Sequence, residues 1–125
     1  AAVSDWKIQN IEKEKIKKEK NISLKLEKNI DILDYVSKHN SLRPKIVIGF
    51  AAETNNLTEN SKKKLSQKNC DWIVANDVSD SSIGFGSDFN EVTIFYKNKE
   101  HEKISKMKKS LLAEKIVERV ISQIN

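Results

Sequence analysis

The chain has 125 residues, of which 38% are hydrophobic and 33% are charged, and its formal net charge is +5. This length suits one domain with a core of its own, and no apolar run approaches the roughly 20 residues that a membrane helix needs. The single cysteine, Cys70, excludes a disulfide within the chain and fits a reducing compartment. The composition therefore predicts a cytoplasmic protein without a membrane anchor.

The positive charge does not by itself predict nucleic-acid binding. Aromatic residues make up only 6% of the chain, and none stands in a stacking motif beside basic residues. Many lysines alternate with glutamates, as in the run Glu12-Lys13-Glu14-Lys15. We therefore expect no nucleic-acid partner, since a few local lysines would serve a bound nucleoside triphosphate equally well.

The first third of the chain predicts little regular structure. Residues 1–3 are apolar and indicate the end of a strand, which leaves Asp5 either as a ligand-binding carboxylate or as a turn cap. The segment 7–20 is mostly charged and predicts an extended, mobile arm. Residues 22–28 alternate between apolar and polar, which predicts a half-buried strand at an edge. A short helix over about 30–38 should follow.

The most informative stretch lies at residues 45–56, where a strand, a small-residue turn and a helix start come in that order. Ile46, Val47 and Ile48 predict a strand that is buried on both faces. Gly49 lets another group approach the backbone closely. Helix N-cap residue types follow at 54–56 and precede a lysine-rich helix. Open α/β folds bind anions at such places, so this turn is predicted to form one wall of a nucleotide site.

Two lysines of that helix, expected to end near Lys68, are candidate phosphate ligands. Lys64 and Lys68 are four residues apart and project from one face, whereas Lys62 points elsewhere. The simpler interpretation is a solvated helix face. A second buried strand over 71–77 would bring Asn76 to the same edge of the sheet, which favours a shared site.

The predicted fold class is α/β: a three-layer Rossmann-like domain with a mainly parallel sheet, plus a protruding flap or edge strand. The final helix should cover about 105–124, because apolar residues recur there at helical spacing. Motifs of metalloproteases, zinc modules, serine hydrolases and P-loop proteins are missing from the sequence. The strands of the main sheet should lie near residues 1–3, 46–50, 72–76 and 92–96.

Several segments, taken together and in order, resemble one family. They are Ala1-Ala2-Val3-Ser4-Asp5-Trp6, Glu14-Lys15-Ile16-Lys17-Lys18, Asn29-Ile30-Asp31-Ile32-Leu33, Gly49-Phe50-Ala51-Ala52-Glu53-Thr54, Ala75-Asn76-Asp77-Val78-Ser79 and Gly84-Phe85-Gly86-Ser87-Asp88. The chain is similar to the phosphopantothenate–cysteine ligase domain. That domain is usually the C-terminal part of the bifunctional phosphopantothenoylcysteine decarboxylase/phosphopantothenate–cysteine ligase flavoprotein of coenzyme A biosynthesis. One departure is Ile30, where bacterial members usually have proline.

The resemblance implies that residues 1–125 form the C-terminal part of a ligase domain, with a flap and dimer-contact segment at about 7–28. Such an enzyme joins 4′-phosphopantothenate to cysteine with CTP and Mg²⁺, through an acyl-cytidylate intermediate. It is expected to be a homodimer. FMN would belong only to the decarboxylase domain, which this chain lacks. The family's early glycine-rich turn would precede Ala1, so the isolated fragment is expected to be inactive.

The resemblance also assigns residues. Lys15 would be the catalytic lysine of the flap, Lys64 and Lys68 would hold the triphosphate, and Asn76 is a candidate residue on the substrate side. No metal ligand from the protein is assigned. The nucleotide-binding positions are Ala1, Asp5, Lys15, Ile30, Asp31, Ile32, Leu33, Phe50, Lys64 and Lys68.

An alternative remains open from the residues alone. A basic α/β module that holds a nucleotide or another polyanion without chemistry would use the same lysines. The residues do not distinguish CTP from ATP, and only the bacterial type of the resemblance favours CTP.

Overall fold

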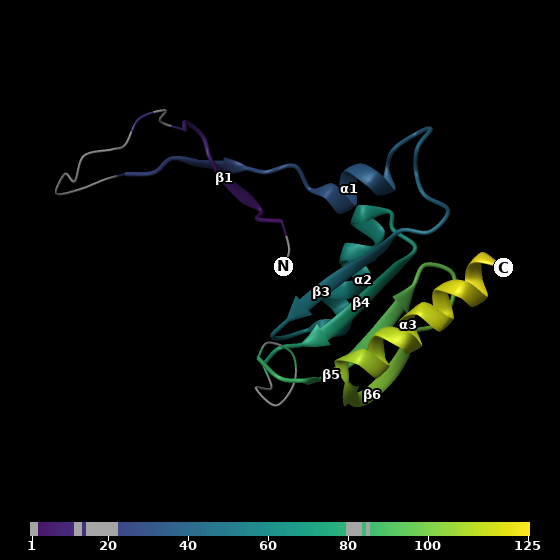
Figure 1. Cartoon of the computed structure of the whole chain (residues 1–125). Coiled ribbons are helices and arrows are strands. Elements are labelled where there is room, and N and C mark those ends of the chain that lie inside the picture. The colour runs from purple at the N-terminus through teal and green to yellow at the C-terminus, as the bar shows by residue number, and fades with distance from the viewer. Residues whose placement is uncertain (1–2, 12–13, 15–22, 80–83, 85) are drawn as a thin grey trace. The chain divides into compact units, whose positions relative to one another are not determined.

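The computed structural model describes residues 3–11, 14, 23–79, 84 and 86–125 (Figure 1). The chain divides into two compact units, Ala1–Ile32 and Leu33–Asn125. None of the described helices is both long enough and apolar enough to cross a membrane.

The first unit contains a small antiparallel sheet. Strand β1 (Trp6–Ile8) pairs with β2 (Leu26–Lys28), and the Lys7 ammonium lies 3.1 Å from the Glu27 carboxylate. The predicted strand at 22–28 is therefore shorter than expected. The start of the predicted arm forms a strand, because Trp6 and Ile8 alternate with Lys7 as a strand requires. Trp6 is 52% exposed instead of packed as its size suggests.

The second unit is a mixed sheet with helices. The strands lie in the order β3-β4-β5-β6. The strand bounds are β3 (Ile48–Glu53), β4 (Trp72–Asp77), β5 (Phe89–Tyr96) and β6 (Glu102–Lys108). The helices are α1 (Ile32–Ser37), α2 (Leu57–Lys68) and α3 (Lys109–Ile124).

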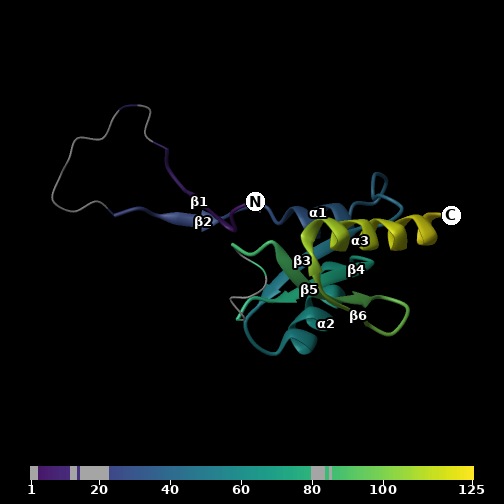
Figure 2. The same ribbon diagram turned by 60° about the horizontal axis from the view of Figure 1, so that its bottom comes forward.

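Helices cover both faces of this sheet, as predicted. In Figure 2, α3 and α2 lie on opposite sides of the strands. Leu112 of α3 packs with Trp72, Val74 and Ile94 in one core cluster. Leu33 and Val36 of α1 and Leu57 and Leu65 of α2 pack on the other cluster, which includes Ile73, Ala75 and Phe95. The α/β class and the three layers are thus confirmed.

The prediction of a mainly parallel sheet is wrong for the described strands. Only β3 and β4 are parallel, whereas β4–β5 and β5–β6 are antiparallel. Parallel neighbours need a crossover, which α2 supplies between β3 and β4. No helix lies among the described residues between β4 and β5, so β5 returns in the opposite direction. The strand expected at 1–3 falls largely outside the described residues, and Val3 is not in a strand.

Several element boundaries also differ from the sequence-based expectations, and β5 begins at Phe89 instead of near residue 92. The strand expected at 46–50 begins at Ile48 and continues to Glu53, so the turn into α2 starts later. The last helix begins at Lys109 instead of 105, because residues 102–108 form β6. Ile104 is buried in this strand and Met107 packs on the same cluster. The lysines beside these two residues concealed the apolar pattern of a strand that, among the described residues, pairs with β5 alone.

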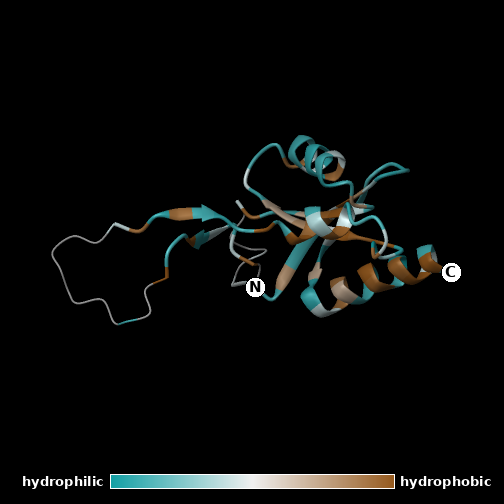
Figure 3. Ribbon diagram, turned by 90° about the horizontal axis from the view of Figure 1, so that it is seen from above, coloured by the Kyte–Doolittle hydropathy of each residue, from teal (hydrophilic) through white to brown (hydrophobic). Residues whose placement is uncertain are grey.

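A polar cluster fastens α3 to the sheet. Arg119 donates hydrogen bonds to both carboxylate oxygens of Glu102 on β6, and the Tyr96 hydroxyl donates to the same carboxylate at 2.9 Å. The Trp72 indole N–H donates to Gln123 at 2.9 Å. The Arg119 guanidinium outweighs partial burial and lowers the pKa of Glu102 to about 2, with Tyr96 adding to this effect. Figure 3 shows that hydrophobic residues recur along α3 among hydrophilic ones, and Leu111, Val117 and Ile121 of this helix are exposed.

This cluster predicts a pH dependence of folding. The pKa of Glu102 falls from 4.5 to about 2 on folding, so its stabilisation is present above about pH 4.5 and is lost as the pH falls through about 2. Because the Glu102 side chain is 38% exposed, we expect Glu102→Gln to cost only about 1 kcal/mol at neutral pH. Urea titrations over this acid range should show a flatter pH dependence for the variant.

The neighbouring Glu100→Gln is the matched control, since Glu100 is exposed on the β5–β6 turn. It removes the same charge without removing the contact to Arg119. Identical pH profiles for the two variants would contradict the assignment to Glu102.

Candidate functional site

The candidate site of the second unit is the carboxyl end of β3 with the adjoining start of α2. The strand ends at Glu53, and α2 begins three residues after Thr54, at Leu57. Asn56 occupies the N-cap position with a positive φ of 47°, and its side chain makes no capping hydrogen bond. The predicted strand–turn–helix sequence is therefore confirmed, but side-chain capping by Asn56 is not.

A hydrogen-bonded triad joins the strand end to the helix. The Lys64 ammonium lies 2.7 Å from Oε1 of Glu53. Asn60 donates from Nδ2 to Oε2 of Glu53 and to the carbonyl oxygen of Asn55, both at 3.1 Å. The Glu53 side chain is only 13% exposed, whereas that of Lys64 is 46% exposed. The carboxylate is thus the enclosed member, and the ammonium is the one that solvent or a ligand can reach.

The second predicted lysine also lies near a carboxylate. Lys68 Nζ is 3.9 Å from Oδ1 of Asp34 on α1, and Lys38 reaches the same oxygen at 2.7 Å. The partner of Lys64 lies on β3 and the partner of Lys68 lies on α1, which itself packs on β3 through Leu33. Lys64 and Lys68 therefore share one side of α2, as their spacing predicts. The sequence did not assign roles to Glu53, Asp34 or Asn60. The four-residue spacing of Asn60 and Lys64 could have indicated their contact.

Two other predicted residues project from the opposite face of the sheet. Phe50 pairs in register with Val74, and Ala52 pairs with Asn76. Val74 belongs to the core cluster on the α3 side, so Phe50 and Asn76 share that side because register partners point to one face. Phe50 is 74% exposed, and a Cβ built on Gly84 would lie 3.3 Å from Asn76 Nδ2. The structure thus places these two residues across the sheet from Lys64 and Lys68.

Gly49 permits a close approach to the backbone, and the group that approaches is Leu33. A Cβ built on Gly49 would lie 2.5 Å from Leu33 Cδ2 and 2.8 Å from Ile73 Cδ1. The glycine therefore lets α1 pack closely on β3. This contact positions Leu33, one of the predicted nucleotide-binding residues, and with it the adjacent Asp34.

The remaining predicted residues belong to the first unit or lie outside the described residues. Ala1 and Lys15 are outside them. The backbone carbonyl of Asp5 accepts a hydrogen bond from Asn29 N–H at 2.8 Å. Ile30 and Ile32 are 70% and 53% exposed, and Asp31 is also exposed.

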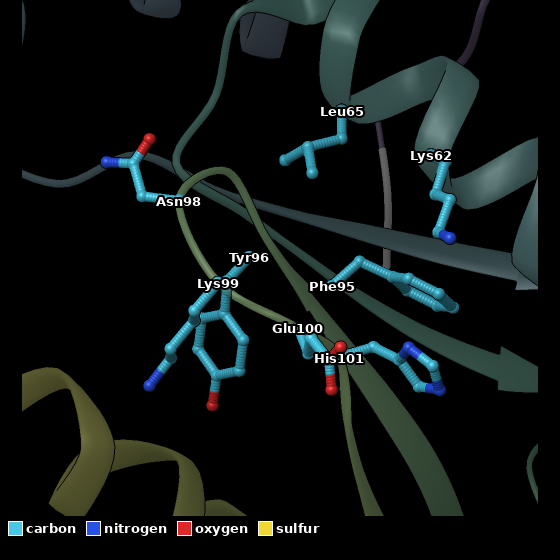
Figure 4. Close-up of a pocket in the computed structure, with 8 residues that line it drawn as sticks. All are labelled: Lys62, Leu65, Phe95, Tyr96, Asn98, Lys99, Glu100 and His101. Carbon is cyan, nitrogen blue, oxygen red and sulfur yellow. The ribbon is translucent and has the colours of Figure 1, made fainter.

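Lys62 lines a different hollow of the molecule, a groove of about 590 Å³ between α2 and the β5–β6 turn. Figure 4 shows Lys62 and Leu65 of α2 on one side of this groove and Phe95 and His101 on the other. The His101 ring stacks on Phe95 with centroids 5.5 Å apart. Lys64 and Lys68 do not line this groove, so Lys62 lies on a different face of α2 from these two lysines, as their spacing predicts.

Carboxylates do not gather into a metal cage in the described part of the chain. No group of three or more His, Cys, Asp or Glu residues there could hold a metal ion.

Comparison with known proteins relates the chain to one family. Residues 1–124 match the family model described as DNA/pantothenate metabolism flavoprotein, C-terminal domain. The coenzyme A biosynthesis bifunctional protein CoaBC of Haemophilus influenzae is 42% identical over 124 residues, covering 98% of this chain and 30% of that protein. CoaBC of Escherichia coli K12 is 37% identical over 128 residues and is covered to 31%. The chain thus spans less than a third of these curated relatives.

Solved structures give the same relationship. The C-terminal domain of a CoaBC protein superimposes with a TM-score of 0.73 and 29% sequence identity. The match covers 99% of this chain but 52% of that domain chain. The DNA/pantothenate metabolism flavoprotein of Streptococcus pneumoniae, with a TM-score of 0.60 and 23% identity, supports the fold alone.

The close approach at Gly49 yields a prediction about stability. Gly49→Ala should lower the free energy of unfolding by about 1–3 kcal/mol, because the new methyl group overpacks the contact with Leu33. Urea denaturation checks this value. In a Leu33→Ala background the same substitution should cost less, since only the close contact with Ile73 Cδ1 then remains. An equal cost in both backgrounds would show that Leu33 does not impose the constraint.

Proposed function

The chain belongs to the family of the C-terminal domain of DNA/pantothenate metabolism flavoproteins, and from this premise we propose that it is part of a phosphopantothenate–cysteine ligase domain. The observation that carries the proposal is the pair of lysines on one side of α2, of which Lys64 lies beside the carboxyl end of β3 and Lys68 lies beside Asp34 of α1. A strand end, a helix start and two ammonium groups suit the phosphates of a nucleotide.

The proposed reaction has two steps. The carboxylate of 4′-phosphopantothenate attacks the α-phosphate of CTP, which gives an acyl-cytidylate and releases pyrophosphate. The amine of cysteine then attacks the acyl carbon and displaces CMP. No protein nucleophile is required. The protein's task is to align the reactants and to neutralise the charge that moves onto the phosphates, with Mg²⁺ supplying part of that neutralisation when bound.

The residues of this chain divide that task. Lys64 and Lys68 hold the triphosphate, and Lys15 closes over it on a flap. Asn76 serves on the substrate side of the same strand ends. Contact with the base and ribose falls to Ile30, Asp31, Ile32, Leu33 and Phe50. Ala1 and Asp5 complete the nucleotide pocket.

The same proposal covers the wider setting of the protein. We infer a cytoplasmic homodimer whose dimer contact includes the segment at about 7–28. FMN would serve only a decarboxylase domain, which lies outside this chain. Since the chain matches 52% of the solved CoaBC C-terminal domain, we expect the isolated chain to lack ligase activity.

A non-catalytic polyanion-binding module is the second candidate, and the net charge of +5 favours it. Calorimetric titration with CTP, ATP and a random oligonucleotide separates the two candidates. Selective binding of CTP supports the ligase. Oligonucleotide binding that weakens steeply with salt supports the module instead.

The two lysines give the first functional prediction. Lys64→Ala and Lys68→Ala should each weaken CTP binding by roughly 1.5–3 kcal/mol, the scale of a charge-assisted hydrogen bond. Lys62→Ala is the matched control and should change the affinity much less, because Lys62 lines the separate groove. Isothermal titration calorimetry on the full-length protein measures all three. Equal losses at Lys62 and Lys64 would indicate a diffuse basic surface.

Lys15 gives a kinetic prediction. If the flap lysine meets the charge that develops on the departing pyrophosphate, Lys15→Gln should lower turnover far more than CTP affinity. Pyrophosphate release from CTP and phosphopantothenate by the full-length protein measures turnover, and calorimetry measures affinity. Wild-type turnover in the Lys15→Gln variant would contradict the proposed role of Lys15 in stabilising the departing pyrophosphate.

A further inference from the structure

The negatively charged Glu53 lies beside Lys64, the lysine that is proposed to bind phosphate. Its carboxylate lies at the end of β3, 2.7 Å from the ammonium of Lys64, and its side chain is only 13% exposed. A carboxylate close to a bound triphosphate repels it, so its presence there calls for a compensating role. The contacts of Glu53 indicate what that role is.

Both carboxylate oxygens of Glu53 have partners. Oε1 accepts from Lys64, and Oε2 accepts from Asn60. The Asn60 carboxamide is itself held by the Asn55 carbonyl at 3.1 Å. Asn60 of α2 thus restrains the orientation of the Glu53 carboxylate, and the Asn55 carbonyl of the turn restrains Asn60. The other carboxylate oxygen accepts the hydrogen bond from Lys64.

A lysine ammonium has three N–H donors. In the described structure one oxygen of Glu53 engages this ammonium, and the 46% exposure of the Lys64 side chain leaves a ligand access to the tip. An unanchored lysine loses side-chain rotamer entropy when a ligand immobilises it. Glu53 removes much of that loss before the ligand arrives.

We propose that Glu53 is a positioning residue for nucleotide binding, which holds the Lys64 ammonium at the carboxyl edge of the sheet with its remaining donors directed to phosphate. The proposal rests on the proposed function, in which Lys64 binds the triphosphate. Asn60 supports Glu53 by fixing the orientation of its carboxylate. Glu53 thus acts through Lys64 and not on the nucleotide itself.

Two substitutions separate positioning from a direct effect of charge. Glu53→Gln keeps an oxygen that accepts from Lys64 and removes the negative charge, whereas Glu53→Ala removes both. Positioning predicts CTP affinity within about twofold of wild type for the first variant and about fivefold weaker for the second. Glu59→Gln is the matched control, because Glu59 is an exposed glutamate in the first turn of α2.

Calorimetry with CTP on the full-length protein tests these values. Tighter binding by Glu53→Ala would overturn the proposal, because the carboxylate would then only compete with phosphate for Lys64. Equal weakening by both variants would also overturn it, since the charge and not the hydrogen-bond acceptor would be required. Unchanged affinity in both variants would overturn it as well.

A second measurement addresses the anchor without any nucleotide. Limited acylation followed by mass spectrometry gives the reactivity of Lys64 relative to Lys62. An anchored ammonium reacts more slowly, so the ratio should rise about threefold in Glu53→Ala and stay near wild type in Glu53→Gln and Glu59→Gln. A merely structural role of Glu53 would leave this ratio unchanged, and that result would overturn the proposal.

The two measurements distinguish a failure of the proposed nucleotide binding from a failure of the proposed positioning role of Glu53. If wild-type protein binds no CTP while the acylation ratio rises in Glu53→Ala, the nucleotide function fails and the anchoring of Lys64 stands. If wild-type protein binds CTP and the ratio does not change, the positioning role of Glu53 fails alone.

Discussion

Strand β4 is the element on which the second unit depends, because both of its faces are buried at once. Trp72, Ile73, Val74 and Ala75 are each 1% exposed or less. Alternate residues enter opposite core clusters, one under α3 and the other under α1 and α2. A strand buried in this way fixes its own register, since a one-residue shift would exchange the two sets of side chains. The parallel partner β3 is thereby fixed as well, and Glu53 is brought level with Asp77.

The fixed strand ends explain the arrangement of charges at the candidate site. Glu53 and Asp34 come from different elements, and each lies beside one of the two lysines of α2. A surface lysine pair without such partners would be a solvated helix face with little geometric definition. Here the strand end, the turn at Asn55 and the first turns of α2 share hydrogen bonds. The positions of the ammonium groups therefore follow from the packing of the sheet.

The contact between Gly49 and Leu33 adds a second link between packing and site. Because Gly49 has no side chain, α1 packs on β3 through Leu33, and Asp34 on the next position approaches Lys68. Phe50 and Asn76 are carried by the same strands but project from the other face. The lysines of α2 thus lie on one side of these two strands, and an aromatic ring and an amide lie on the other.

The sequence by itself determined the strand β4 that is buried on both faces, the presence of a strand at β3, the helix between them and the shared face of Lys64 and Lys68. Each of these depends on local periodicity or spacing, which the chain carries without reference to distant residues. Burial of β3 on both faces was predicted wrongly, since Phe50 is 74% exposed. Only the tertiary structure decided that β5 and β6 are antiparallel, because strand direction depends on the path of the chain between strands. It also decided that residues 102–108 form a strand, since lysines beside Ile104 conceal a pattern that pairing with β5 stabilises. The contacts of Glu53 with Lys64 and of Asp34 with Lys68 were also decided by the tertiary structure. These partners are 11 and 34 residues apart in the sequence, so their contacts depend on how β3, α1 and α2 pack.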